Sequence, residues 1–231
     1  MIETLKGSAF RLALSDSLPI LFGYLPLGMA FGILFDSLGY AWAYAPIAGI
    51  IIYAGSAQFL AVGLITSGAS LLEIFMATFA LNFRHIFYGL SVFDRYPKSG
   101  LRRWYLIFGL TDETYAVITG KPAPDIDQKI DYYFHLTLLS QSYWILGCGI
   151  GAGLQSWFEF DSRGFEFTLV ALFLVILIEQ IRILQNIKPV LIASAGASGA
   201  LILFDNQFLA VAIGFSALVI AMDYRLDFLN D

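Results

Sequence analysis

The stretch LPILFGYLPLGMAFGILF, residues 18–35, carries no charged side chain and decides which solvent surrounds the fold. A helix needs about 20 consecutive apolar residues to cross the hydrocarbon core of a bilayer. Lys6 and Arg11 precede the stretch, as in a secretory signal peptide, but its apolar part exceeds the usual signal core of about 7–15 residues. We therefore expect an uncleaved first transmembrane helix with the amino end in the cytoplasm.

The composition of the whole chain points to the same class of protein. Its 231 residues are 58% hydrophobic and 13% charged, with a mean hydropathy of +0.75. Soluble proteins average about 45–50% apolar and about 25% charged residues. The chain is therefore predicted to be an integral membrane protein with a single transmembrane domain over residues 1–231. Its net charge of -5 offers no basic surface to a phosphate backbone, so nucleic acid is not an expected partner.

Further apolar runs follow the first, separated by short polar segments. Closed β-barrels would instead show alternating segments of about ten residues. Continuous runs therefore predict an all-α, polytopic helical bundle of about six to eight spans, with some helices broken or re-entrant. The runs cover residues 18–35, 41–65, 71–92, 104–118, 134–158, 167–183, 189–204 and 208–222.

Glycine and proline interrupt the first two runs. Gly28 and Gly32 are compatible with two interpretations, a helix break or the close packing of a second helix against small residues. The pair Gly55-Ser56 favours a break, because the polar residue Gln58 follows at once. Transporters use such breaks near the middle of the membrane, where the amino end of a half-helix points at an anionic group of the substrate.

Positive charges leave two arrangements open for the middle of the chain. Lys6 and Arg11 place the amino end in the cytoplasm, and the basic segment 95–103 would also be cytoplasmic. Three full crossings between them cannot satisfy both. Either the run 41–65 is a re-entrant pair of half-helices and the run 104–118 a second partial segment, or eight full crossings leave the basic segment on the far side.

Polar residues in the third and fourth runs are the candidates for a functional site. The segment LNFRHIFYGL, residues 81–90, contains Arg84, and an unpaired charge at mid-membrane costs roughly 2.5–3.5 kcal/mol. Its counter-charge is expected in TDET, residues 111–114, where Asp112 and Glu113 are adjacent. Neighbours on a helix point about 100° apart, so at most one acid can face Arg84, and the other could bind a solute or carry a proton. A purely structural ion pair is the alternative.

Signs of an enzyme are weak. The histidines, His85 and His135, have no nearby cysteine and lack the spacing of a metal site, and no serine lies in a nucleophile elbow. We therefore expect neither catalysis nor a metal or other cofactor.

Four stretches resemble the AzlC family, the larger subunits of bacterial branched-chain amino acid exporters. They are GYLPLGMAFGILF at 23–35, AGSAQFLAVGLI at 54–65, LNFRHIFYGLS at 81–91 and LTDETYAV at 110–117. They occur in this order, and beyond Lys121 only the hydropathy pattern fits the family. The resemblance implies a permease of the bacterial inner membrane that acts with a small AzlD-type membrane partner. It also implies export of valine, leucine and isoleucine, with methionine as a further candidate.

The motifs of the family fall on the charged and polar candidates identified above. The family's Asn-x-Arg-His pattern falls on Asn82, Arg84 and His85, and its Asp-Glu pair falls on Asp112 and Glu113. Export driven by the proton gradient would use His85, Asp112 and Glu113. The candidate substrate-binding residues are Gly55, Ser56, Gln58, Phe59, Asn82, Arg84, Asp112 and Glu113.

A zwitterionic amino acid fits these residues in a particular way. Its carboxylate would meet Arg84 or the half-helix end at Gly55, and its ammonium would meet one of the acids. Aromatic residues such as Phe59 and Phe87 would hold its side chain. Two alternatives remain open. One is a transporter or channel for another small solute, and the other is a membrane scaffold that moves no solute and uses the charged residues only for folding.

Overall fold

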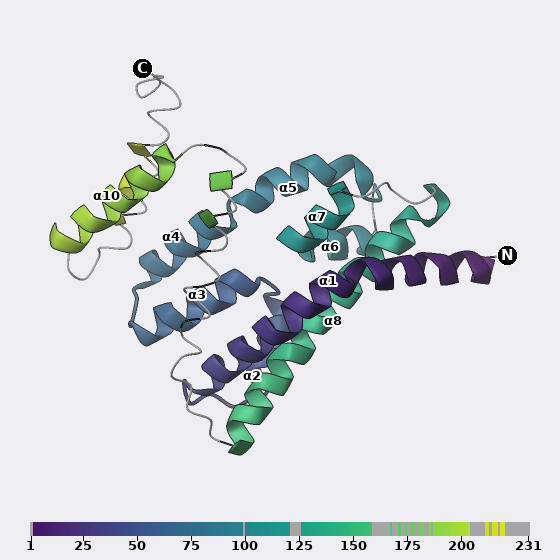
Figure 1. Cartoon of the computed structure of the whole chain (residues 1–231), viewed down its shortest axis with the longest axis horizontal. Coiled ribbons are helices and arrows are strands. Elements are labelled where there is room, and N and C mark those ends of the chain that lie inside the picture. Colours follow the sequence, from purple (N-terminus) through teal and green to yellow (C-terminus); the bar gives the residue numbers. More distant parts are fainter. Residues whose placement is uncertain are drawn as a thin grey trace. The chain divides into compact units, whose positions relative to one another are not determined.

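A computed structural model of the protein describes residues 2–98, 100–120, 126–158 and 188–203, with isolated residues between 167 and 187 and between 211 and 219. The elements of these parts of the chain are all helical, which confirms the all-α prediction (Figure 1). They are α1 (Ile2–Asp36), α2 (Tyr44–Ile51), α3 (Gly55–Thr66), α4 (Leu71–Asn82), α5 (Arg84–Val92), the 3-10 helix η1 (Phe93–Arg95), α6 (Leu101–Phe108), α7 (Asp112–Gly120), α8 (Ile126–Phe158) and α10 (Lys188–Leu203).

Contacts between residues divide the chain into two compact units. The first comprises residues 1–62 and 83–168, and the second comprises residues 63–82 and 169–231. The first unit contains the charged candidate residues of α5 and α7. A single domain over the whole chain stays a prediction.

The first apolar run forms the second half of α1, which continues through Pro19 and Pro26 without a break. Its segment Ala9–Asp36 is the one helix, among the described residues, that is long and apolar enough to cross a membrane. Two further apolar helices, α3 and α10, are shorter. The number of spans therefore stays a prediction.

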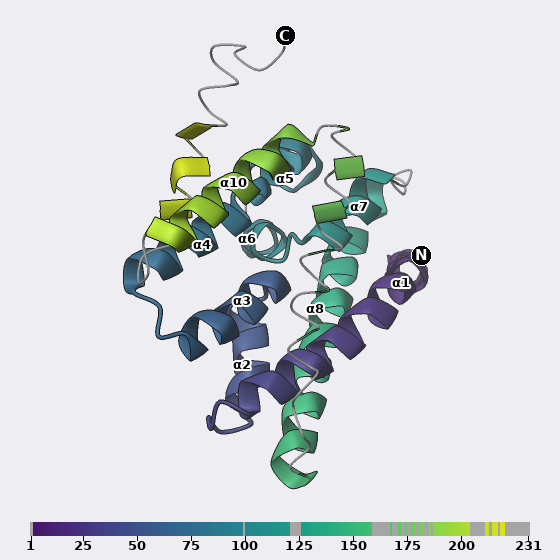
Figure 2. The ribbon, with the colours of Figure 1, turned by 60° about the vertical axis from the view of Figure 1, so that its left-hand side comes forward.

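Glycines bring α1 and α8 into close contact, and both views of the ribbon show the two helices side by side (Figures 1 and 2). A Cβ atom on Gly28 would lie 2.9 Å from a carbonyl oxygen of α8, and one on Gly147 would lie 2.7 Å from a carbonyl oxygen of α1. A Cβ atom on Gly32 or Gly151 would collide with the opposite backbone. Of the two interpretations of Gly28 and Gly32, close packing is therefore correct.

A break does occur in the second apolar run. α2 ends at Ile51 and α3 begins at Gly55, as the pair Gly55-Ser56 predicts. Between the two helices, Tyr53 has a left-handed φ of +42°. Non-glycine residues rarely adopt this conformation, so the break is a defined feature of the backbone.

The third and fourth apolar runs are also divided. α4 and α5 are separated by Phe83, whose φ of -56° and ψ of -33° remain helical. The run 104–118, expected as one partial segment, consists of α6 and the start of α7. The Thr114 N–H donates to the Thr111 hydroxyl at 3.3 Å, so Thr111 caps a new helix where a continuous one was expected.

Trp144 of α8 connects the helices around the break between α2 and α3. Its ring centre lies 5.6 Å from that of Tyr24 and 6.2 Å from that of Phe31, both on α1. The ring of Phe59 on α3 lies 6.4 Å away. A Cβ atom on Gly55 would be only 3.0 Å from the indole, so a glycine at the start of α3 allows the ring to lie against the backbone.

In the second unit, Glu73 is buried and is the one charged residue of α4. The Ser70 backbone N–H and hydroxyl both donate to Glu73 Oε2 at 2.8 Å, and the Glu73 N–H donates to the Ser70 hydroxyl oxygen at 3.3 Å. This arrangement is a capping box, which gives Glu73 a structural role at the start of α4. The run 189–204 corresponds to α10, while the runs 167–183 and 208–222 lie largely outside the described residues.

Candidate functional site

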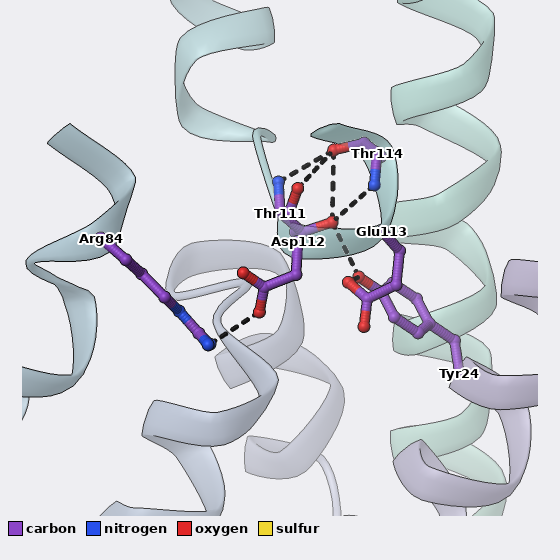
Figure 3. A network of polar contacts seen from close by, with 6 residues as sticks. All are labelled: Tyr24, Arg84, Thr111, Asp112, Glu113 and Thr114. Carbon is purple, nitrogen blue, oxygen red and sulfur yellow. Dashed lines mark hydrogen bonds and ion pairs between the residues drawn. The ribbon is translucent and has the colours of Figure 1, made fainter. Parts of the chain in front are cut away.

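Arg84 of α5 and Asp112 of α7 point toward each other in the first unit (Figure 3). The Arg84 Nη2 and Asp112 Oδ2 atoms are 2.6 Å apart, and the two side chains are 20% and 35% exposed. The expectation that Arg84 has a counter-charge in TDET is therefore confirmed, with Asp112 as its partner. Both residues lie in the first turn of a helix, next to a break in an apolar run.

The ion pair leaves hydrogen-bonding capacity unused on both sides. Arg84 Nε and Asp112 Oδ1 are buried, and neither has a hydrogen-bond partner within the described part of the chain. A buried polar atom without a partner costs about 1–3 kcal/mol. A further polar group could therefore bind here without separating the two charges.

Two threonines build the start of α7. The Thr111 backbone N–H donates to the Thr114 hydroxyl oxygen at 2.9 Å, and the Thr114 N–H donates back to the Thr111 hydroxyl oxygen. This reciprocal cap places Asp112 and Glu113 in the first turn of the helix. Because the amino end of a helix carries a partial positive charge, it stabilises negative charge at both positions.

Glu113 turns away from Arg84 and toward α1 (Figure 3). The Tyr24 hydroxyl lies 2.5 Å from Glu113 Oε2 and 2.8 Å from the Thr111 hydroxyl oxygen. A phenol has one proton and can donate to only one of the two at a time. Tyr24 is buried, so the Glu113 carboxylate is hydrogen-bonded to a hydroxyl in the interior of the first unit. The expectation that only one acid faces Arg84 is confirmed.

A second set of polar groups lies at the break between α2 and α3. Gln58 is 1% exposed, and its Oε1 atom accepts a hydrogen bond of 2.9 Å from Trp144 Nε1. The Gln58 Nε2 atom and the hydroxyl of Tyr53, which is 3% exposed, have no hydrogen-bond partner among the residues described. Phe59 is buried against Phe31, with ring centres 5.8 Å apart. Gln58 and Phe59, both expected to bind substrate, thus lie in the interior.

The remaining candidates have local contacts. The Asn82 side-chain amide donates to the Thr78 carbonyl oxygen, one turn earlier in α4, at 3.0 Å. The His85 ring lies edge-on to Tyr88, with ring centres 5.5 Å apart, and Tyr88 stacks on Tyr115 of α7 at 4.3 Å. Aromatic rings therefore fill the space beside the ion pair on α5 and α7.

Sequence reasoning missed several residues that make these contacts, namely Tyr24, Tyr53, Thr111 and Trp144. Tyr24 had a signal, because it is the only hydroxyl-bearing residue in the run 18–35. Thr111 directly precedes Asp112 and fits the pattern of a helix N-cap, whereas Tyr53 and Trp144 had no signal, since only the tertiary packing brings them to this site. Gly55 and Ser56, which the sequence did indicate, are partly exposed in the first turn of α3.

Similarity to known proteins extends over most of the chain. A family model described as AzlC protein matches residues 19–158. A membrane protein of Helicobacter pylori, described as uncharacterized, is 36% identical over 224 residues, 96% of this chain and 97% of that protein. The branched-chain amino acid transport protein AzlC of Bacillus subtilis is 36% identical over 207 residues, 89% of this chain and 82% of that protein. The inner membrane protein YgaZ of Escherichia coli is 32% identical over 209 residues, 86% and 84% of the two chains. No solved structure matches the chain.

Proposed function

Because the chain belongs to the AzlC family, we propose that it is a permease subunit that exports branched-chain amino acids across the bacterial inner membrane. The relatives named as membrane proteins, and the one named as a branched-chain amino acid transport protein, support this function. The observation that carries the proposal is the cluster of Arg84, Asp112 and Glu113 around the start of α7, within otherwise apolar runs. The substrates are valine, leucine and isoleucine, with methionine as a further candidate.

The proposal includes the setting in which the subunit works. The chain crosses the membrane several times, and Lys6 and Arg11 before the first span keep its amino end in the cytoplasm. A small AzlD-type membrane protein is its partner. The proton gradient supplies the energy for export.

A zwitterionic substrate meets two kinds of group in this site. Asp112 is already paired with the Arg84 guanidinium, whereas Glu113 is hydrogen-bonded by the neutral hydroxyl of Tyr24. Glu113 therefore keeps its charge for the substrate ammonium, while Arg84 or the amino end of α3 receives the carboxylate. Phe59, which is buried, and Phe87, which is exposed, are the candidates for holding the aliphatic side chain.

Glu113 is also the foremost candidate for the coupling proton, ahead of His85 and Asp112. A protonated carboxyl group has no charge with which to attract an ammonium group. Protonation and amino acid binding therefore exclude each other at Glu113, which is the condition for exchanging one for the other. The Tyr24 hydroxyl, 2.5 Å away, can donate to the carboxylate while it is ionised.

Leucine counterflow tests this function. Protein reconstituted with its small partner into leucine-loaded vesicles should accumulate radiolabelled leucine. Arg84→Ala and Glu113→Gln should each lower the rate about tenfold or more, because each removes a charge-assisted contact. Arg102→Ala is the matched control, since Arg102 pairs with Asp131, away from the cluster.

The outcomes distinguish the alternatives. Wild-type rates from correctly inserted Arg84→Ala and Glu113→Gln would refute the site. Counterflow of other small solutes, but not of leucine, would favour a transporter or channel with another substrate. Failure of the wild type to move any solute in such a panel would favour a membrane scaffold.

A further inference from the structure

Two buried hydrogen-bond donors lie at the break between α2 and α3. Neither has a role in the proposed binding of the ammonium group by Glu113 or in the Arg84–Asp112 ion pair. We propose that the Tyr53 hydroxyl and the Gln58 side-chain amide, together with the amino end of α3, bind the carboxylate of the transported α-amino acid. This subsite rests on the proposed transport function and deepens it, because it selects the end of α3 over Arg84 as the place where the carboxylate binds.

Trp144 decides the orientation of the Gln58 amide. An indole N–H can only donate, so the atom 2.9 Å from Trp144 Nε1 must be the amide oxygen. The Gln58 Nε2 atom therefore faces elsewhere with two N–H donors, in a side chain that is 1% exposed. Within the described part of the chain it has no hydrogen-bond partner. Such a buried group, which can only donate, is satisfied by an acceptor.

Packing holds Tyr53 in an uncommon conformation. Its φ of +42° lies in the left-handed region, which residues with a Cβ atom rarely adopt. Its ring centre lies 6.5 Å from that of Tyr24 and 6.3 Å from that of Phe108, the last residue of α6. Contacts with α1 and α6 thus keep a strained residue at the break, and its buried hydroxyl has no partner among the residues described. Retained strain of this kind is typical of ligand sites.

The chemistry of these groups selects an anion. Gln58 Nε2 only donates, the Tyr53 hydroxyl can donate, and the free N–H groups at the start of a helix carry partial positive charge. Trp144 brings the side chain to the helix end, because its N–H holds Gln58 while its ring lies against Gly55. A carboxylate would accept the hydrogen bonds that these donors offer.

Tyr24 joins this subsite to the acid. Its ring packs against that of Tyr53, and its hydroxyl is hydrogen-bonded to Glu113 (Figure 3). Tyr53 and the Glu113 carboxylate thus contact one shared side chain. That placement suits a ligand whose own carboxylate and ammonium are attached to the same carbon. Arg84 then contributes by holding Asp112, 2.6 Å away, rather than by binding the substrate.

Leucine and 3-methylbutylamine, which is leucine without its carboxylate, separate the two parts of the ligand. Tyr53→Phe removes one donor, and Gln58→Glu keeps the acceptor for Trp144 while it replaces the other donor. In reconstituted vesicles, each variant should raise the leucine concentration for half-maximal counterflow about tenfold, the effect of one lost hydrogen bond to a charged group. The inhibition constant of the amine should stay within about twofold of its wild-type value, because the amine never contacts these donors.

Tyr133→Phe is the matched control. Tyr133 is buried, and its hydroxyl also lacks a hydrogen-bond partner among the described residues, but its ring lies beside Tyr96 rather than at the start of α3. It should leave both constants unchanged. Equal changes for leucine and the amine, or unchanged leucine constants in Tyr53→Phe and Gln58→Glu, would overturn the subsite. A wild type without leucine counterflow would instead overturn the proposed function, and the subsite with it.

Discussion

Two arginine–aspartate pairs in the first unit share a bond length and differ in their surroundings. Arg84–Asp112 and Arg102–Asp131 both have an N···O distance of 2.6 Å. The Arg84 side chain is 20% exposed and lies in an apolar run, whereas that of Arg102 is 53% exposed and lies in a basic segment. The N···O distance therefore does not reveal how much an ion pair contributes to stability. That contribution depends on whether each charge would face water or an apolar environment without its partner.

The energies at stake differ accordingly. An ion pair exposed to water contributes about 0–1 kcal/mol. An unpaired charge at mid-membrane costs roughly 2.5–3.5 kcal/mol on insertion scales. Arg102 also keeps a second contact when its partner is lost, since its guanidinium carbon lies 5.4 Å from the centre of the Phe134 ring. Removal of one partner should thus lower the stability of the protein substantially only for Arg84–Asp112, the pair in the apolar runs.

Removal of Asp112 should have the largest effect. Asp112→Asn leaves Arg84 without a counter-charge and should lower the free energy of unfolding by about 3 kcal/mol. The matched change Asp131→Asn should lower it by less than about 1 kcal/mol. Unfolding of the purified variants in lipid nanodiscs measures both values. Equal losses in the free energy of unfolding would show that the two pairs do not differ in their contribution to stability.

Exchange of the two charges separates stability from transport. The double variant Arg84→Asp with Asp112→Arg restores the attraction and should recover most of the roughly 3 kcal/mol lost by Asp112→Asn. Leucine counterflow should nevertheless stay about tenfold or more below wild type, because the cation and the carboxylate now occupy reversed positions beside Glu113. Full counterflow in the exchanged protein would limit the pair to a structural role.

A smaller loss of stability is expected when the turn between α6 and α7 is pushed away from α8. A Cβ atom on Gly109 would collide with Thr137 Cγ2 of α8, so Gly109→Ala should cost about 2 kcal/mol through overpacking. Adding Thr137→Ser removes that methyl group and should restore most of the stability. Gly120→Ala is the control, because no atom of the described residues lies within 4 Å of its added Cβ atom. Unfolding midpoints that show no rescue by Thr137→Ser would exclude this contact as the cause.

Loss of the Tyr24 hydroxyl should be milder still. Tyr24→Phe removes the hydrogen bond to Glu113 and should lower the free energy of unfolding by about 1.5 kcal/mol, the lower end for a bond to a charged group. The same measurement on Tyr24→Phe with Glu113→Gln isolates the coupling between the two residues. A coupling near zero would mean that Glu113 gains nothing from this neighbour, in contrast to Asp112 with Arg84.

Salt should separate the two ion pairs by the smallest amount. The screening length falls from about 10 Å at 0.1 M to about 3 Å at 1 M ionic strength, and it acts mainly on charges in water. The coupling energy of Arg102–Asp131 from a double-mutant cycle should fall by a few tenths of a kcal/mol over this range. That of Arg84–Asp112 should not change. A parallel decline of both would place the two pairs in the same medium.

Sequence reasoning reached the buried pair but not its geometry. An arginine in an apolar run requires a counter-charge, and TDET supplies two acids in the next run. The partners were therefore predictable from the free energy that an unpaired charge costs in the membrane. Which acid faces Arg84 depends on the rotation of α7 about its axis. That rotation follows from the cap at Thr111 and from the contact of Gly109 with α8. An N-cap pattern can indicate the cap, but no sequence pattern reveals the contact with α8.

The glycines likewise differ in whether the sequence or only the tertiary structure reveals their role. Gly55 marked the break before α3 because a polar residue follows it, and the structure confirms that break. For Gly28 and Gly32 the pattern allowed either a break or close packing, since both need a small residue. Only the position of α8 decides between them, because its backbone leaves no room for a Cβ atom at Gly32.

By itself, the sequence determined the helical class, the cost of Arg84 in its apolar run and the break at Gly55, because hydropathy, charge and backbone freedom are properties of single residues and their neighbours. The tertiary structure alone decided that Asp112 pairs with Arg84, that Glu113 is hydrogen-bonded to Tyr24, and that Gln58 is hydrogen-bonded to Trp144. These contacts join helices far apart in the chain. They depend on how those helices rotate and pack against one another, which local sequence does not encode.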